Sequence, residues 1–223
     1  NLAATDQSTD TCTNNFATLN PLVKTYGTMT YSKGNTKMSG TGGWNATLST
    51  VGLSTGKWWI EIDEVNVTNN TFWGICSEQL STGTLSASAT PYNLNTGMIL
   101  WHEDGRKTVD GSNTESHFAD WTAGVLGMAI DLDSGTRTVK FYSGGSQTGD
   151  TINLTANFVA GDFVFPIFMS NSGSNPANFH VNFGNPAYAL SSAATDENGY
   201  GAFEHAPPSG YLSICTLNLA ENG

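Results

Sequence analysis

Two short acidic stretches have spacings that could serve chemistry, and the first is Asp131-x-Asp133 followed by a glycine. Carboxylates at this spacing open the calcium loop of an EF-hand, which also needs a bidentate Glu near its twelfth position. Residues 140–142, Lys-Phe-Tyr, occupy that neighbourhood instead. Asp and Gly also tolerate the positive φ of a tight turn between strands. The stretch therefore favours a β-hairpin, and we expect no metal and no cofactor.

The second acidic pair is Glu61 and Asp63, two residues apart in an alternating stretch. Retaining glycosidases use two carboxylates, one as nucleophile and one as acid/base. The third acidic residue of such a strand motif would fall at Val65 or Asn66, and Glu64 points to the other face. We therefore predict that Glu61 and Asp63 are polar residues on a partly solvated sheet face and do not catalyse. A glycoside hydrolase is the distant alternative.

Other catalytic signatures are missing from the sequence. It has no phosphate loop and no CxxC pair. The four histidines are too scattered in the sequence to have the spacing of metal ligands: His102, His117, His180 and His205. We therefore expect a protein that is not an enzyme.

A binding site is predicted where aromatic and polar residues gather in the stretch 90–107, TPYNLNTGMILWHEDGRK. Aromatic rings beside carboxylates and amides are typical of sugar and peptide sites. Large aromatics are also the usual filling of a core, and that alternative stays open for each tryptophan. The candidate ligand-binding residues are Trp44, Tyr92, Trp101, His102, Glu103, Asp104, Arg106 and Trp121.

Composition limits the partners of such a site. Of the 223 residues, 38% are hydrophobic and only 12% are charged, and the formal net charge is −11. An acidic chain has no electrostatic basis for binding nucleic acid or an anionic membrane. No apolar run approaches the roughly 20 residues of a membrane helix. The chain starts at an Asn, and we expect it to be part of a longer chain.

The elements that would position these residues are strands. In the stretch 57–67, Trp58, Ile60 and Ile62 face one side and Trp59 and Glu61 the other. Similar short apolar runs recur along the chain between Gly, Ser, Asn and Asp turns. We predict an all-β protein, a two-sheet antiparallel β-sandwich with almost no helix.

Three motifs resemble those of SPRY domains and occur in the expected order. They are GLSTGKWWIEIDEV from residue 52, GVLGMAIDLDSGTRTVKFYSGG from residue 124, and FPIFMSNSGS with ANFHVNFGNPAY up to residue 188. The resemblance implies a bent two-sheet antiparallel sandwich, related to the concanavalin-like jelly roll. It also implies binding through loops at one end of the sheets, without chemistry.

The flanking segments, DTCTNNFATLNPL and residues 182–223, resemble a group of SPRY-containing bacteriophage proteins. This resemblance implies one domain over residues 1–223, with the segments 1–21 and 206–223 packed on the core. It also implies a virion surface location, other virion proteins as partners, and trimerisation through flanking regions. Two roles follow as alternatives: a tail-fibre-like module that binds a host glycan or protein, or a purely structural, decorating domain.

A disulfide between Cys12 and Cys215 is a further alternative. Strand-like Thr-Leu-Asn stretches lie near both ends, and we expect the terminal segments to lie side by side. Disulfide-bonded residues have Cα atoms about 4.4–6.8 Å apart. Terminal segments that lie side by side would bring Cys12 and Cys215 within this distance. Cys12 also stands where the resemblance leads us to expect Pro. Assembly in a reducing cytosol argues against the bond, so both states stay open.

Overall fold

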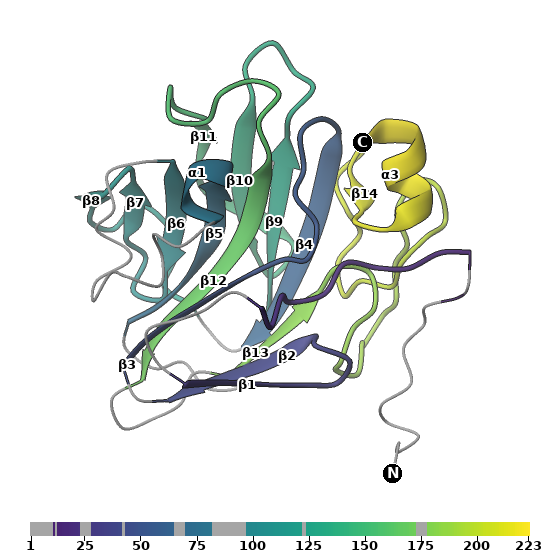
Figure 1. Ribbon diagram of the computed structural model, residues 1–223, viewed down its shortest axis with the longest axis horizontal. Helices are drawn as coiled ribbons and strands as arrows, with labels where there is room; N and C mark the ends of the chain where they lie inside the picture. The colour runs from purple at the N-terminus through teal and green to yellow at the C-terminus, as the bar shows by residue number, and fades with distance from the viewer. Residues whose placement is uncertain are drawn as a thin grey trace.

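The computed structural model describes residues 11, 13–22, 28–41, 43–64, 70–81, 97–121, 124–172 and 178–223. In these ranges the chain forms an eight-stranded and a six-stranded sheet, packed face to face (Figure 1). All strand pairs are antiparallel except one short parallel pair. The predicted all-β sandwich is confirmed. No helix in the described ranges is long and apolar enough to cross a membrane.

The eight-stranded sheet has the order β1-β2-β13-β4-β9-β10-β11, and β14 pairs with β4 in parallel. Its strands are β1 (Thr28–Ser32), β2 (Lys37–Thr41), β13 (Asn178–Asn182), β4 (Lys57–Glu64), β9 (Val125–Asp131), β10 (Thr138–Ser143), β11 (Ser146–Asn153) and β14 (Leu212–Ser213). The predicted hairpin is confirmed, because β9 and β10 pair from Asp131 opposite Thr138 to Leu126 opposite Ser143.

The six-stranded sheet has the order β3-β12-β5-β6-β7-β8. Its strands are β3 (Gly43–Leu48), β12 (Val164–Ser172), β5 (Thr71–Ser77), β6 (Met98–His102), β7 (Lys107–Val109) and β8 (Ser112–Thr114). A short helix, α1 (Glu78–Ser81), follows β5 and places Leu80 against the outer face of this sheet. Trp44 and Phe72 pack on the same outer face, with ring centroids 5.5 Å apart.

The main core lies between the sheets and follows the alternation of the strands. Trp58, Ile60 and Ile62 of β4 are fully buried in it, whereas Trp59 belongs to a separate cluster on the other face. Trp73 and Trp101 enter the same core from the six-stranded sheet. Burying one such side chain stabilises the fold by about 1.5–3 kcal/mol, so this core dominates the stability of the sandwich.

One end of the sandwich, which we call the loop end, gathers the polar turns. The end of β4 lies beside the start of β9, as Asp63 pairs with Val125. In the other sheet the start of β5 lies beside the end of β6. Since only residues 65–70 separate β4 from β5, the two sheets share this end. The β6–β7 turn, the β10–β11 turn and the start of β9 therefore lie at the loop end.

The described parts of the two terminal segments pair with each other beside the first half of β4. The amide of Ala17 donates to the carbonyl of Ile214 at 2.9 Å, and that of Thr216 donates to Asn15 at 2.9 Å. The strand-like expectation for the last residues was wrong, because Thr216–Asn222 forms the helix α3, which lies beside β14 (Figure 1). The Asn218 side chain fixes this helix by donating to Asp196 and to Ser213.

Candidate functional site

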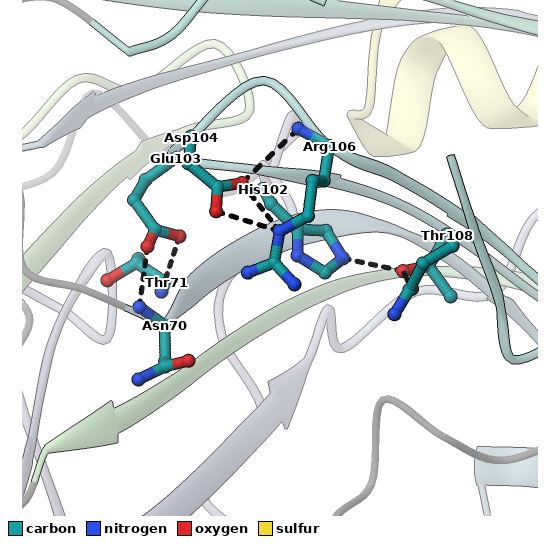
Figure 2. A network of polar contacts seen from close by, with 8 residues as sticks. Asn70, Thr71, His102, Glu103, Asp104, Arg106 and Thr108 are labelled. Atoms are coloured by element: carbon teal, nitrogen blue, oxygen red, sulfur yellow. Dashed lines mark hydrogen bonds and ion pairs between the residues drawn. The ribbon is translucent and has the colours of Figure 1, made fainter. Parts of the chain in front are cut away.

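The β6–β7 turn is fixed by a buried carboxylate, as Figure 2 shows. Glu103, 8% exposed, accepts hydrogen bonds from the backbone amides of Asn70 at 2.6 Å and Thr71 at 2.9 Å. Burial raises the pKa of Glu103 above its ordinary value, although these hydrogen bonds oppose the shift. Glu103 thus joins the turn to the start of β5, and its carboxylate oxygens are already engaged.

Asp104, whose side chain is 47% exposed, and Arg106, whose side chain is 22% exposed, form the outer part of the same turn. The Nε atom of Arg106 lies 2.9 Å from Oδ1 and 2.7 Å from Oδ2 of Asp104. Burial acts to raise the pKa of Asp104, but the hydrogen bonds from Arg106 outweigh it and hold that pKa below its usual range. The pair therefore stays ionised at neutral pH and presents a fixed charge pattern to solvent.

His102 points away from solvent, into the outer face of the six-stranded sheet. Its ring lies edge-on to Phe72, with centroids 4.1 Å apart, and Nε2 is 2.6 Å from Oγ1 of Thr108. The Thr108 hydroxyl donates to Oδ1 of Asn113 at 2.5 Å, so His102 must be the donor in its own bond to Thr108. Burial and then the charge of Arg106 lower the pKa of His102 to about 3. His102 is a neutral structural residue at pH 7.

The predicted tryptophans lie in the interior. Trp101 is completely buried, and its indole donates to the carbonyl of Ala119 at 3.1 Å. Trp121, 5% exposed, packs edge-on against Trp101 with centroids 5.7 Å apart, and Trp44 is 8% exposed. In this conformation they offer little or no surface to a ligand. Tyr92 lies outside the described residues, and its predicted role stays a prediction.

A pocket of about 330 Å³ opens on the eight-stranded sheet at the loop end. It lies between the end of the sheet and the segment that follows β13, and its lining includes the apolar side chains of Val125 and Ala189. The polar side chains in its wall are Asp63, Tyr188, Ser191, Glu204 and His205. Sequence reasoning missed all of these except Asp63, because they come from distant parts of the chain and form no local motif.

Glu61 lies beneath this pocket, and its predicted place on a partly solvated face was wrong. It is fully buried and accepts hydrogen bonds from four donors: Asn182 Nδ2, the Tyr188 hydroxyl, and the amides of Glu204 and His205. Burial raises the pKa of Glu61, against the hydrogen bonds from His205 and Glu204. The segment after β13 covers the strand here, and Glu61 holds that segment down.

The two carboxylates of the acidic hairpin, Asp131 and Asp133, bond to neighbouring protein groups and have a structural role. Asp131 accepts hydrogen bonds from the amide and hydroxyl of Ser134 and lies 3.1 Å from Nζ of Lys57. Asp133 accepts a hydrogen bond from the amide of Gly56 at 2.6 Å. Within the described ranges, no group of three or more His, Cys, Asp or Glu residues could hold a metal ion.

Cys215 is buried with a free thiol within the described ranges, and Cys12 lies outside them, so the disulfide stays a prediction.

No protein-family model matches the chain. No curated protein matches it either. Solved structures do: the TRIM65 PSpry domain matches at 15% identity and a TM-score of 0.56, over 75% of this chain and 90% of that domain.

Two further structures match at similarly low identity. Stonustoxin is 15% identical with a TM-score of 0.52, and the match covers 75% of this chain but only 27% of that one. The SPRY domain of human HERC1 is 18% identical with a TM-score of 0.48, over 65% of this chain and 86% of that domain. Identities this low bear on the fold alone. The chain therefore has the SPRY-like β-sandwich fold that its sequence motifs indicate.

Proposed function

We propose that this chain is a non-enzymatic binding module that contacts another macromolecule through its loop end. The observation that carries the proposal is the open pocket at this end, whose wall includes the carboxylates of Asp63 and Glu204, with the partly exposed Asp104–Arg106 pair at the same end of the other sheet. Binding residues are often placed on loops that a rigid scaffold positions. Similarity of fold to the TRIM65 PSpry domain is compatible with this role.

The loop end is well suited to binding because its turns are held in place before any partner arrives. The amides of His117 and Phe118 donate to the carbonyl of Gly105 at 2.9 and 2.8 Å, and the amide of Trp121 donates to the carbonyl of Glu103 at 2.8 Å. Gly105 has a φ of +77°, which the tight turn requires. A surface ordered in advance loses less conformational entropy on binding.

The carboxylates at this end argue against hydrolysis. A general acid needs a raised pKa together with access to the substrate. Glu61 and Glu103 have raised pKa values but are buried and hydrogen bonded. Glu204 is partly exposed, but hydrogen bonds from Ser191 lower its pKa. None of these three carboxylates combines a raised pKa with access to a substrate, which supports a binding role.

We further propose a setting on the surface of a bacteriophage particle, in a tail-fibre-like protein that attaches to a host glycan or protein. The resemblance of the flanking segments to phage SPRY-containing proteins supports this setting. The composition also suits it, since neutral polar residues rather than charges solvate the chain. Other virion proteins, and further copies of the chain held through flanking regions, would be the structural partners.

The test uses the fluorescently labelled chain on a panel of bacterial cells and on a glycan array. Saturable binding to one cell type or glycan is expected, with loss in the double variant Asp104→Ala/Arg106→Ala. Asp162→Ala is the control, because it precedes β12 at the opposite end of the sandwich. If no cell or glycan is bound, or if only the control variant loses binding, the proposal fails.

A further inference from the structure

The pocket on the eight-stranded sheet exposes hydrogen-bond acceptors. Glu204 is partly exposed and accepts hydrogen bonds from the amide of Ser191, at 2.7 Å, and from the Ser191 hydroxyl. Asp63, whose side chain is 30% exposed, has Oδ2 3.7 Å from Nδ1 of His180. Each of these carboxylates keeps lone pairs for a further donor, since an ionised carboxylate has about four acceptor positions.

The aromatic residue in the wall is not placed as a platform for a sugar. Tyr188 stacks against His180, with ring centroids 6.3 Å apart and planes 10° apart. Its hydroxyl donates inward to Oε2 of Glu61 at 3.4 Å. One ring face and the hydroxyl proton are therefore already used, which disfavours the stacking that usually binds a pyranose ring.

The charges around Asp63 and Glu204 leave the pocket anionic. Burial and then the charges of Lys37 and Lys33 lower the pKa of His180, against the influence of Asp63, so His180 is neutral at pH 7 and does not cancel the Asp63 charge. The lysines act from the β1–β2 hairpin and are not among the residues that line the pocket. His205 is the basic residue in that lining, and the whole chain carries a net charge of −11.

We propose that this pocket receives a basic side chain, arginine or lysine, from a partner protein, and that Asp63 and Glu204 are its anionic contacts. Carboxylates bind guanidinium groups through strong, charge-assisted hydrogen bonds. A volume of about 330 Å³ is at the lower end of ligand pockets, which suits one side chain better than an extended ligand. The inference rests on the proposed function, because it names the chemistry that the loop end would recognise.

Small probes test the pocket without knowledge of the partner. Backbone amide shifts of the ¹⁵N-labelled chain are followed by NMR at pH 7 during titration with N-acetyl-arginine amide and N-acetyl-lysine amide. N-acetyl-glutamate amide and galactose are titrated in parallel. We expect the basic probes to shift the amides of Val125, Ser191 and His205, and 0.5 M NaCl to weaken their binding. Asp63→Asn should weaken it at least tenfold.

Asp150→Asn is the matched control, because it removes the same charge from an exposed position on β11 and should leave the affinity unchanged. Absence of pocket shifts with both basic probes overturns the inference. So does an equal response to galactose or to the acidic probe. If the basic probes fail while Asp104→Ala/Arg106→Ala still abolishes cell binding, the binding module survives and only the nature of its ligand is wrong. If the basic probes bind the pocket while Asp104→Ala/Arg106→Ala still binds cells, the chemistry of the pocket stands and the Asp104–Arg106 pair is not part of the binding surface.

Discussion

His102 should make the folded chain sensitive to acid, and the variant His102→Gln should remove that sensitivity. The folded-state pKa of His102 is about 3, because the ring is buried and lies near Arg106, whereas an unfolded histidine titrates near 6.5. Between these two values the unfolded chain binds a proton that the folded chain does not. The free energy of unfolding must therefore fall as the pH falls below about 6.5.

The size of the effect follows from the two pKa values. Each unit of difference corresponds to about 1.4 kcal/mol, so lowering the pH from 7 to 4.5 should cost about 2.5 kcal/mol through His102 alone. This is a large share of a typical domain stability of about 5–15 kcal/mol. The Gln side chain keeps an N–H that can donate to Thr108 but does not titrate.

The assay is urea unfolding at a series of pH values, followed by tryptophan fluorescence. Carboxylates also titrate in this range, but they do so in the variant as well, so the difference between the two curves isolates His102. Thr108→Ser keeps the acceptor hydroxyl and should leave the wild-type pH dependence intact. Parallel curves for the wild type and His102→Gln would refute the assignment of His102 as a buried, neutral histidine.

Three further predictions concern Glu61, the acidic hairpin and the cysteines. Glu61→Gln should lower stability at pH 7 by about 1–3 kcal/mol in urea melts, because an amide cannot accept from all the donors that meet there. Because the fold raises the pKa of Glu61, protonation of Glu61 stabilises the wild type below about pH 4.5. The wild type's advantage over Glu61→Gln in the free energy of unfolding should therefore shrink as the pH rises through the pKa that Glu61 has in the folded chain. An advantage that stays constant with pH contradicts this. Calcium should leave Tm unchanged, and a rise that Asp133→Asn abolishes would show a metal site. Mass spectrometry after alkylation without reduction should label only Cys76 if Cys12 and Cys215 are bonded, whereas three labels exclude the bond.

Local periodicity was sufficient to predict several of the strands and their faces, β4 and the β9–β10 hairpin among them. The alternation of Trp58, Ile60 and Ile62 matches their burial in the core between the sheets. The same rule applied to β6 would have placed His102 correctly, since Met98, Leu100 and His102 share one face of that strand. The charged neighbours that follow His102 gave it instead the appearance of a turn residue.

Contacts between distant segments could not be predicted in this way. Glu61 sits at a polar position of β4, and a segment more than a hundred residues later covers it with the amides of Glu204 and His205. The pocket wall arises from the same long-range packing, so no spacing in the sequence marks Tyr188 or Ser191 as site residues. Likewise α3 depends on the bonds of Asn218 to Asp196 and Ser213 rather than on helical periodicity.

The pairing of the terminal segments has a practical consequence for experiments on the isolated chain. Asn15 and Ala17 lie beside Thr216 and Ile214, and β14 runs along the start of β4, away from Asp63. The C-terminal helix ends beside the start of β4, where the hydroxyl of Thr55 lies 3.5 Å from the carbonyl of Asn222. An affinity tag, fluorophore or sensor-chip linkage attached after Gly223 would thus be anchored away from the loop end, and the pocket and the Asp104–Arg106 pair would face the solution. Chains immobilised in this way should therefore give the same binding curve as chains free in solution, which makes the two formats a check on each other.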